Sequence, residues 1–187
     1  MKKFILASKS PRRKELLEKC GISFTCDPAD INETVDLSLA KTEAIRLLAY
    51  RKAEEVFKRH REDIVIGSDT IVTIDDMILG KPKNREDAAG MLERLQGRTH
   101  MVITGLCILS DQRCYSDVSV AKVTFAKMDR KEIEKYVATG ECDDKAGAYG
   151  IQGIGGRYVK RIEGDYYTIM GLPLNMVYEE LRNQSLY

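Results

Sequence analysis

The first twenty residues constrain the fold most, because a short apolar run, a polar turn and a helical pattern follow one another directly. Residues 4–7, Phe-Ile-Leu-Ala, have the composition of a short buried strand. Ser10 is a typical helix N-cap and Pro11 suits the first helical position. The apolar spacing over residues 12–20 predicts a helix, which Gly21 is suited to end. A strand joined to a helix by a tight polar turn favours a fold that mixes strands and helices.

The rest of the chain continues this mixture of extended and helical patterns. Patterns of apolar residues predict strands at 22–26, 63–68, 70–74, 77–79, 97–109, 115–126 and 158–162, and helices at 38–58, 84–95, 129–139 and 173–182. We place a polar turn at the end of the strand over 63–68. With 187 residues, of which 43% are hydrophobic, the chain can bury one sizeable core. We therefore expect an α/β protein with a single domain spanning residues 1–187.

Composition excludes several classes of protein. The formal net charge is +1, whereas a protein that coats nucleic acid usually carries a basic excess, so we expect no nucleic-acid partner. No stretch approaches the ~20 apolar residues needed to span a bilayer, and we expect no membrane partner. The five cysteines are odd in number and scattered, and the chain has two histidines. A disulfide framework, a zinc knuckle and a His-rich metal site are therefore not expected, and reduced thiols in the cytoplasm are.

The turn at residues 8–13, Ser-Lys-Ser-Pro-Arg-Arg, is a candidate anion site. A strand-to-helix turn presents backbone N–H groups and the positive end of a helix dipole, which bind phosphate readily. Ser8 and Ser10 add hydroxyls, and Arg12 and Arg13 add guanidiniums that can form paired hydrogen bonds to phosphate. A capped surface helix with two solvated arginines explains the same residues, and the spacing alone leaves both interpretations open.

Two carboxylates are candidate metal ligands. Asp69 comes just past the end of a predicted strand, where α/β folds place ligands, and an acidic loop supplies Glu33. Carboxylate oxygens suit Mg²⁺, which keeps several of its waters. Taken alone, a capping Asp in a turn and a solvated acidic loop remain the simpler interpretations.

Two lysines and a glutamine complete the candidate residues. Lys81 stands between a glycine and a proline, which restricts its backbone, and Lys52 lies in the predicted helix over 38–58. Ordinary surface positions explain both lysines equally well. Gln152 lies in a glycine-dense segment, and its amide offers donors and an acceptor to the edge of a base. For His100, in a predicted strand, a packed and hydrogen-bonded side chain is the simpler interpretation.

In combination, these motifs closely resemble the Maf family of nucleotide pyrophosphatases, over residues 4–178. The segments that carry the resemblance are Leu6 to Leu17, Glu33, Lys52-Ala53, Gly67 to Thr70, Gly80 to Pro82, Thr99-His100, Asp144 to Tyr149 and Gly171 to Leu174. The resemblance implies an α/β fold with a mixed, strongly bent sheet flanked by helices and a central cleft, similar to inosine triphosphate pyrophosphatases. It also implies a cytoplasmic, often dimeric hydrolase that uses Mg²⁺ or Mn²⁺ to convert a nucleoside triphosphate to the monophosphate and pyrophosphate.

The resemblance also implies roles for individual residues. Asp69 matches the proton acceptor of the family, and Glu33 matches its acidic partner, so these two carboxylates are the expected metal ligands. Lys52 and Lys81 match catalytic basic residues. Ser8, Ser10 and Arg13 are the expected ligands of the phosphates.

Three positions that look like specificity determinants are Arg12, Thr70 and Gln152, and all three follow the branch that acts on dTTP and UTP. An alternative from a different class is a nucleotide-binding regulator of cell division, as an older, septum-related family name suggests.

Overall fold

The computed structural model describes residues 2–36 and 38–184 and divides into two compact units. Unit 1 contains residues 1–69, 104–119 and 170–187, and unit 2 contains residues 70–103 and 120–169. Each unit is described by itself below. The expectation of a single domain stays a prediction.

The described strands pair in a mixed sheet with the order β2-β1-β3-β5-β6-β7, and β4 pairs with β3. The short strand β1 (Phe4–Leu6) runs parallel to β2 (Phe24–Cys26) and to β3 (Ile64–Ile74). Antiparallel pairs join β3 to β4 (Met77–Leu79) and β6 (Cys114–Phe125) to β7 (Val159–Glu163). The long strand β5 (Thr99–Leu109) lies between β3 and β6. The predicted mixed sheet is thereby confirmed.

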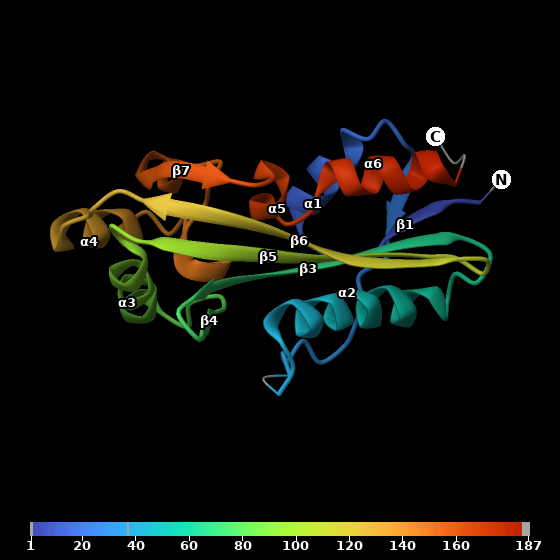
Figure 1. Cartoon of the computed structure of the whole chain (residues 1–187), viewed down its shortest axis with the longest axis horizontal. Coiled ribbons are helices and arrows are strands. Elements are labelled where there is room, and N and C mark those ends of the chain that lie inside the picture. The colour runs from blue at the N-terminus through green and yellow to red at the C-terminus, as the bar shows by residue number, and fades with distance from the viewer. Residues whose placement is uncertain (1, 37, 185–187) are drawn as a thin grey trace. The chain divides into compact units, whose positions relative to one another are not determined.

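In unit 1, helix α2 (Lys41–Phe57) lies on one face of the strands, and α1 (Pro11–Glu18) and α6 (Leu174–Asn183) lie on the other (Figure 1). Two glycines let the backbone of α2 come close. A Cβ at Gly67 would lie 2.5 Å from the carbonyl oxygen of Ala49, and one at Gly105 would lie 2.4 Å from that of Ile45. Real Cβ contacts are longer, so any other residue at either glycine would push α2 away from the sheet.

In unit 2, helices α3 (Arg85–Leu95) and α4 (Arg130–Ala138) bury their apolar faces in one core with residues of β3, β6 and the segment before β7. Side chains cap both helices, because Asn84 accepts a hydrogen bond from the Asp87 amide and Asp129 forms a reciprocal capping box with Glu132. Two short 3-10 helices, η1 (Ala146–Ala148) and η2 (Ile154–Tyr158), lie in the glycine-dense segment.

Most predicted elements occur within a few residues of the expected bounds, but the polar turn expected at the end of the strand over 63–68 was wrong. Strand β3 runs without a break from Ile64 to Ile74, so the chain makes no turn at Ser68 and Asp69 lies inside the strand. Helix α2 begins at Lys41, three residues later than expected. The short helix α5 (Tyr166–Met170) was not predicted, because five residues are too few to show a helical period.

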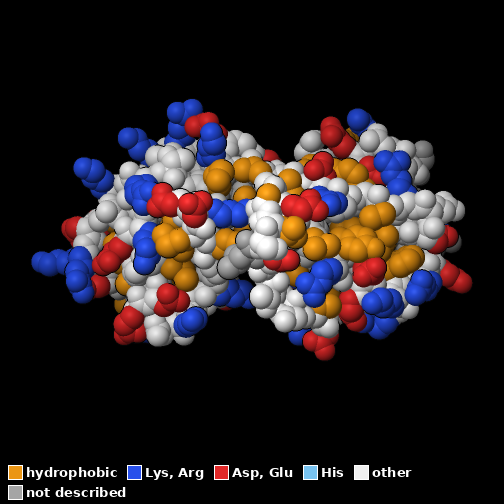
Figure 2. Space-filling view, turned by 60° about the horizontal axis from the view of Figure 1, so that its bottom comes forward, with side chains coloured by type: hydrophobic (Ala, Val, Ile, Leu, Met, Phe, Trp, Pro, Cys, Tyr) orange, Lys and Arg blue, Asp and Glu red, His pale blue; other side chains and the backbone are white. Residues whose placement is uncertain are grey.

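The surface carries charges of both signs. On the face in Figure 2, basic and acidic side chains alternate with exposed hydrophobic ones, as the formal net charge of +1 suggests. All five cysteines lie in the described part of the chain, and none is disulfide-bonded. Within residues 2–36 and 38–184, no helix is both long and apolar enough to cross a membrane.

Candidate active site

Three charged side chains of unit 1 meet at one point, which we call the Lys52 cluster (Glu33, Lys52 and Asp69). The Nζ atom of Lys52 lies 2.5 Å from Oδ1 of Asp69 and 2.8 Å from Oε1 of Glu33. Lys52 is only 5% exposed, although lysine is seldom buried. The two carboxylates differ, because the side chain of Asp69 is 14% exposed and that of Glu33 is 60% exposed.

The local sequence explains why these residues meet. Side chains alternate between the two faces of a strand, so Asp69 points to the same face of β3 as Gly67. Gly67 lies directly under the backbone of α2, near Ala49 and Ala53. Lys52 precedes Ala53 on that helix, so its buried amine lies beside the carboxylate of Asp69. The prediction that Asp69 follows the end of a strand is therefore wrong, because the side chain is held in mid-strand by its packing against α2.

Burying the charges of this cluster costs free energy, and its two carboxylates are suited to binding a cation. An amine removed from water must be compensated, and breaking such a pair costs about 3–5 kcal/mol because one charge is left without a partner. Here two carboxylate oxygens converge on a single positive atom, which is the donor arrangement that a hard divalent cation prefers. Among the described residues, no group of three or more His, Cys, Asp or Glu side chains is placed to hold a metal ion. Two carboxylates are enough for Mg²⁺, which usually keeps waters and binds substrate phosphates as well.

The Ser8–Arg13 turn packs beside this cluster, with Ser10 as the predicted N-cap of α1. The Ser10 hydroxyl accepts a hydrogen bond from the Arg13 amide at 3.4 Å. The Ser8 hydroxyl accepts one from the Ser10 amide at 3.1 Å and one from the Arg13 guanidinium at 3.4 Å. Nε of Arg13 donates to the carbonyl of Gly171 at 2.8 Å, and the buried hydroxyl of Ser68 donates to the same oxygen at 2.9 Å. The turn is thus tied to strand β3 through one carbonyl.

Arg13 also interacts electrostatically with the Lys52 cluster. Burial lowers the pKa of Arg13 below its ordinary value, the negative charges of Asp69 and Glu33 act in the opposite direction, and the neighbouring Arg12 lowers it further. The charges of Arg13, Asp69 and Glu33 in unit 1 therefore lie close enough to influence one another. Sequence reasoning missed the part played by Gly171 and Ser68, although both belong to the motifs that it had singled out.

The other predicted site residues occupy simpler positions. Arg12 is half-buried on α1 in unit 1. Thr70, Lys81 and Gln152 belong to unit 2. Thr70 is half-buried on β3, and Lys81 and Gln152 are exposed.

In unit 2, one hydrogen bond connects the segments that carry Lys81 and Gln152. The amide of Gly147, which precedes Gln152 in the glycine-dense segment, donates to the carbonyl of Gly80 at 3.1 Å. Gly147 has a positive φ of 72°, and a Cβ there would lie 3.0 Å from Val72, so the chain can pass this close to β3 only as glycine.

Gln152 lies in a loop built around a carboxylate, which we call the glycine loop (residues 150–156). The carboxylate of Glu141 accepts hydrogen bonds from the amides of Ile154 at 2.7 Å and Gly155 at 2.9 Å, and from the hydroxyl of Tyr136 at 2.8 Å. Burial raises the pKa of Glu141, but the hydrogen bonds from Gly155, Ile154 and Tyr136 outweigh that effect, and the pKa lies below its ordinary value. Sequence reasoning gave Glu141 no role, because nothing in the sequence shows where the amides of a distant loop will point.

His100 is buried in unit 2, as the simpler interpretation predicted. Its Nε2 atom lies 2.9 Å from the hydroxyl of Tyr149, and its ring packs edge-on against Phe125 and Tyr149. In the described part of the chain, Nδ1 of His100 has no hydrogen-bond partner. Burial lowers the pKa of His100 to about 4 and raises the pKa of Tyr149 above its ordinary range.

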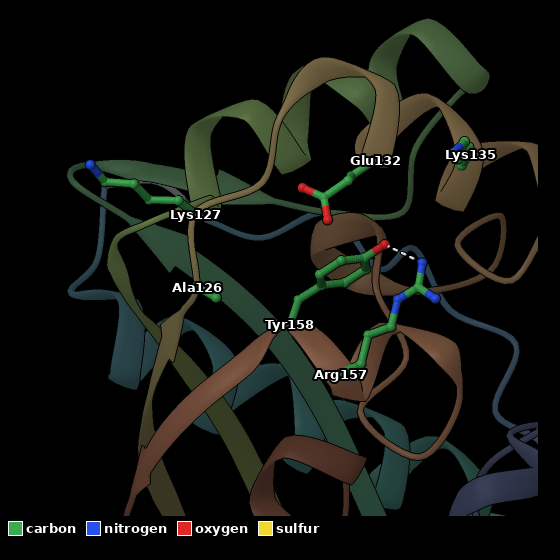
Figure 3. A pocket seen from close by; sticks show the side chains of 6 residues that line it. All are labelled: Ala126, Lys127, Glu132, Lys135, Arg157 and Tyr158. Carbon is green, nitrogen blue, oxygen red and sulfur yellow. Dashed lines mark hydrogen bonds between the residues drawn. The ribbon is translucent and has the colours of Figure 1, made fainter.

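A shallow pocket of unit 2 lies elsewhere (Figure 3). The side chains that line it are Ala126, Lys127, Glu132, Lys135, Arg157 and Tyr158. Arg157 donates to the hydroxyl of Tyr158, and Figure 3 shows Lys127 pointing away from both. No predicted site residue lines this pocket, so it does not locate the reaction.

The mixed sheet, with two carboxylates and a buried amine meeting at one of its strands, places the chain among the α/β enzymes. The family of Maf-like proteins matches residues 3–184, and the chain belongs to that family.

Curated relatives are similar along almost the whole chain. One from Geobacillus sp. (strain WCH70) is 48% identical over 182 residues, covering 97% of this chain and 98% of the relative. One from Bacillus cytotoxicus is 46% identical over 182 residues, covering 97% and 95%. Each of these relatives is named a dTTP/UTP pyrophosphatase.

A solved structure resembles the fold. The Ham1 protein of Staphylococcus aureus aligns with 98% of this chain and 100% of its own, with a TM-score of 0.53 and 14% identity. At that identity the likeness concerns the fold alone, and it agrees with the expected fold class.

Proposed function

We propose that the chain hydrolyses dTTP and UTP to the nucleoside monophosphate and pyrophosphate. The observation that carries this proposal is the Lys52 cluster, in which two carboxylates and a buried amine lie beside Arg13. Such a set of acids and cations suits phosphoryl-type transfer, which needs mainly positioning and electrostatic stabilisation. The names of the relatives support the choice of dTTP and UTP.

Glu33 and Asp69 would hold a divalent metal ion, Mg²⁺ or Mn²⁺. Their oxygens fit it, because both already contact one cationic atom, the Nζ of Lys52. When bound, such an ion lowers the pKa of a coordinated water and neutralises charge on the phosphates. Asp69 is held rigidly between β3 and α2, so we assign it the role of accepting a proton from the attacking water. Lys52 keeps both carboxylates in place and stabilises the negative charge that develops.

The turn at Ser8–Arg13 would bind the triphosphate. Arg13 supplies a guanidinium whose Nε atom is already fixed by Gly171, so little freedom is lost when the group binds. The hydroxyls of Ser8 and Ser10 border the same turn and can donate to phosphate oxygens. The family resemblance gives Lys81 a catalytic role, and its exposed ammonium in unit 2 can stabilise negative charge.

Base selection would depend on Gln152, with Thr70 and Arg12 as further determinants. The amide of Gln152 is exposed and offers a donor and an acceptor, which match the N3–H and O4 groups of uracil and thymine.

The family resemblance supports two further proposals, a cytoplasmic location and a homodimer. Sedimentation of the purified chain tests the second.

Release of pyrophosphate from a panel of nucleoside triphosphates tests the function. We expect release from dTTP and UTP with Mg²⁺ or Mn²⁺, much less from CTP, GTP and ATP, and none with EDTA. If no nucleotide gives metal-dependent release, the proposal fails and the alternative of a nucleotide-binding regulator gains support.

A further inference from the structure

We propose that Glu141 is a positioning residue for base selection: its carboxylate fixes the backbone of the glycine loop and thereby aims the amide of Gln152. The inference rests on the proposed role of Gln152 in reading the base. Glu141 is not part of the Lys52 cluster, and it acts on the loop rather than on the reacting atoms.

The hydrogen bonds hold the loop on both sides of Gln152. After it, the amides of Ile154 and Gly155 donate to the two oxygens of Glu141. Before it, the amide of Gly150 donates to the hydroxyl of Tyr136 at 3.1 Å, and that hydroxyl donates to Glu141. Hydrogen bonds to a carboxylate are stronger than those between neutral groups, so Glu141 holds both ends of the segment that contains Gln152.

The glycines of the loop show how closely the chain wraps this carboxylate. A Cβ at Gly153 would lie 2.2 Å from Oε2 of Glu141, and one at Gly155 would lie 2.6 Å from the hydroxyl of Tyr136. Gly153 has a negative φ of −107°, so it does not lie in the left-handed region. A side chain at position 153 would instead have to displace the carboxylate of Glu141.

A loop with glycines at 150, 153, 155 and 156 is intrinsically flexible, because glycine has the widest choice of backbone conformations. Selection between two bases needs a hydrogen-bonding group held at a fixed place, since a mobile amide can turn to suit either base. The hydrogen bonds from Gly155, Ile154 and Tyr136 keep the pKa of Glu141 below its ordinary value, so the carboxylate is charged at neutral pH. The hydrogen bonds to Glu141 thus restrict the backbone of a loop that its glycines would otherwise leave flexible.

Glu141→Gln tests the proposal, because the amide that replaces one oxygen cannot accept a hydrogen bond from a loop N–H. We expect the ratio of kcat/KM for UTP over CTP to fall about tenfold, since misplacement by an ångström has effects of this size or larger. We also expect the amides of Ile154 and Gly155 to exchange hydrogen about tenfold faster or more, as they lose a charged acceptor. Glu134→Gln is the matched control, because Glu134 lies on the preceding helix α4 and pairs at the surface with Arg130.

The two measurements separate positioning from mere stability. Faster exchange with an unchanged UTP-to-CTP ratio would make Glu141 a structural residue and overturn the proposal. Unchanged exchange would show that the carboxylate does not hold the loop, which also overturns it.

Gly153→Ala approaches the same contact from the loop side and serves if Glu141→Gln folds poorly. The methyl group clashes with the carboxylate in the natural chain, so the UTP-to-CTP ratio should fall, and adding Glu141→Ala should remove most of the further effect of Gly153→Ala. Gly90→Ala is the control, because a Cβ at Gly90 meets nothing within 4 Å. Independent effects of the two changes would contradict the proposed contact.

Gln152→Ala distinguishes this inference from the role on which it rests. If Gln152→Ala leaves the ratio unchanged while Glu141→Gln lowers it, Gln152 does not read the base, and the proposal that Glu141 acts by aiming Gln152 is overturned. If both variants leave the ratio unchanged, neither the loop nor its anchor selects the base.

Discussion

The Lys52 cluster and the glycine loop each surround one charged group, which is buried for Lys52 and half-buried for Glu141, but different groups compensate that charge. In the cluster, the amine of Lys52 is compensated by the side chains of Asp69 and Glu33. In the loop, the carboxylate of Glu141 is compensated mainly by the backbone amides of Ile154 and Gly155.

The two regions therefore differ in how they can respond when a ligand binds. A side-chain carboxylate can accept from a second cation as well as from Lys52 without moving the backbone, so the Lys52 cluster is suited to binding a metal ion and substrate during turnover. Backbone amides cannot exchange their acceptor without a change in the loop itself. We infer that the cluster governs the rate of the reaction and that the loop governs which base is accepted.

The largest expected effect comes from Asp69→Asn in the Lys52 cluster. The substitution keeps the shape of the side chain but removes the proton acceptor, so kcat/KM should fall about 10²–10⁴-fold for every nucleotide. The loss should be the same for UTP and CTP, whereas Glu141→Gln should change the ratio between them. Steady-state kinetics with both nucleotides measure both effects.

Thermal unfolding is the control for Asp69→Asn. Lys52 still pairs with Glu33 in this variant, so the protein should stay folded. If Asp69→Asn turns over UTP at the natural rate, or changes only the base preference, the Lys52 cluster does not govern the rate of the reaction.

A second prediction concerns acid stability and tests the packing next to the glycine loop. Burial lowers the pKa of His100 to about 4, from an ordinary value near 6.5. The unfolded chain therefore binds this proton more readily than the folded one, so the free energy of unfolding should fall as the pH drops from about 6.5 to about 4. The gap between the two values corresponds to roughly 3 kcal/mol.

Urea unfolding of the natural chain and of His100→Gln, at several pH values from 7 to 4, measures this contribution. Gln can still bond the hydroxyl of Tyr149 but does not titrate, so the variant should lose less stability on acidification. Equal losses in the two proteins would mean that His100 does not take up a proton on unfolding in this range.

The sequence predicted most of the elements because each left a local pattern. The N-cap at Ser10, the helix predicted at 84–95 and the strands predicted at 97–109 and 115–126 depend on residues close in the chain. The continuity of β3 through Ser68 and Asp69 could not be predicted, because polar residues in a strand look like a turn until their partners on other elements are known.

The geometry of the candidate site could not be predicted from the sequence. The family resemblance selected Glu33, Lys52 and Asp69, and the structure joins all three at one amine. Glu141 was not predicted, because its function depends on backbone amides, which every residue has and which no motif identifies. The sequence identifies the chemistry of each side chain, whereas the direction of a backbone amide depends on the conformation of the folded loop.

The smallest expected effect comes from Gly67→Ala, which tests the Lys52 cluster through its packing rather than its charges. A Cβ at Gly67 would lie 2.5 Å from the carbonyl of Ala49 and 2.8 Å from the amide of Ala53, so α2 must shift away from β3. We expect a loss of about 1–3 kcal/mol in the free energy of unfolding, together with a lower kcat, because α2 carries Lys52. Gly90→Ala, on α3, where an added Cβ meets nothing within 4 Å, should instead be neutral or stabilise by about 0.5–1 kcal/mol. If Gly67→Ala lowers stability but leaves kcat intact, the spacing between α2 and β3 does not set the position of Lys52, and the rate depends on the charges of the cluster alone.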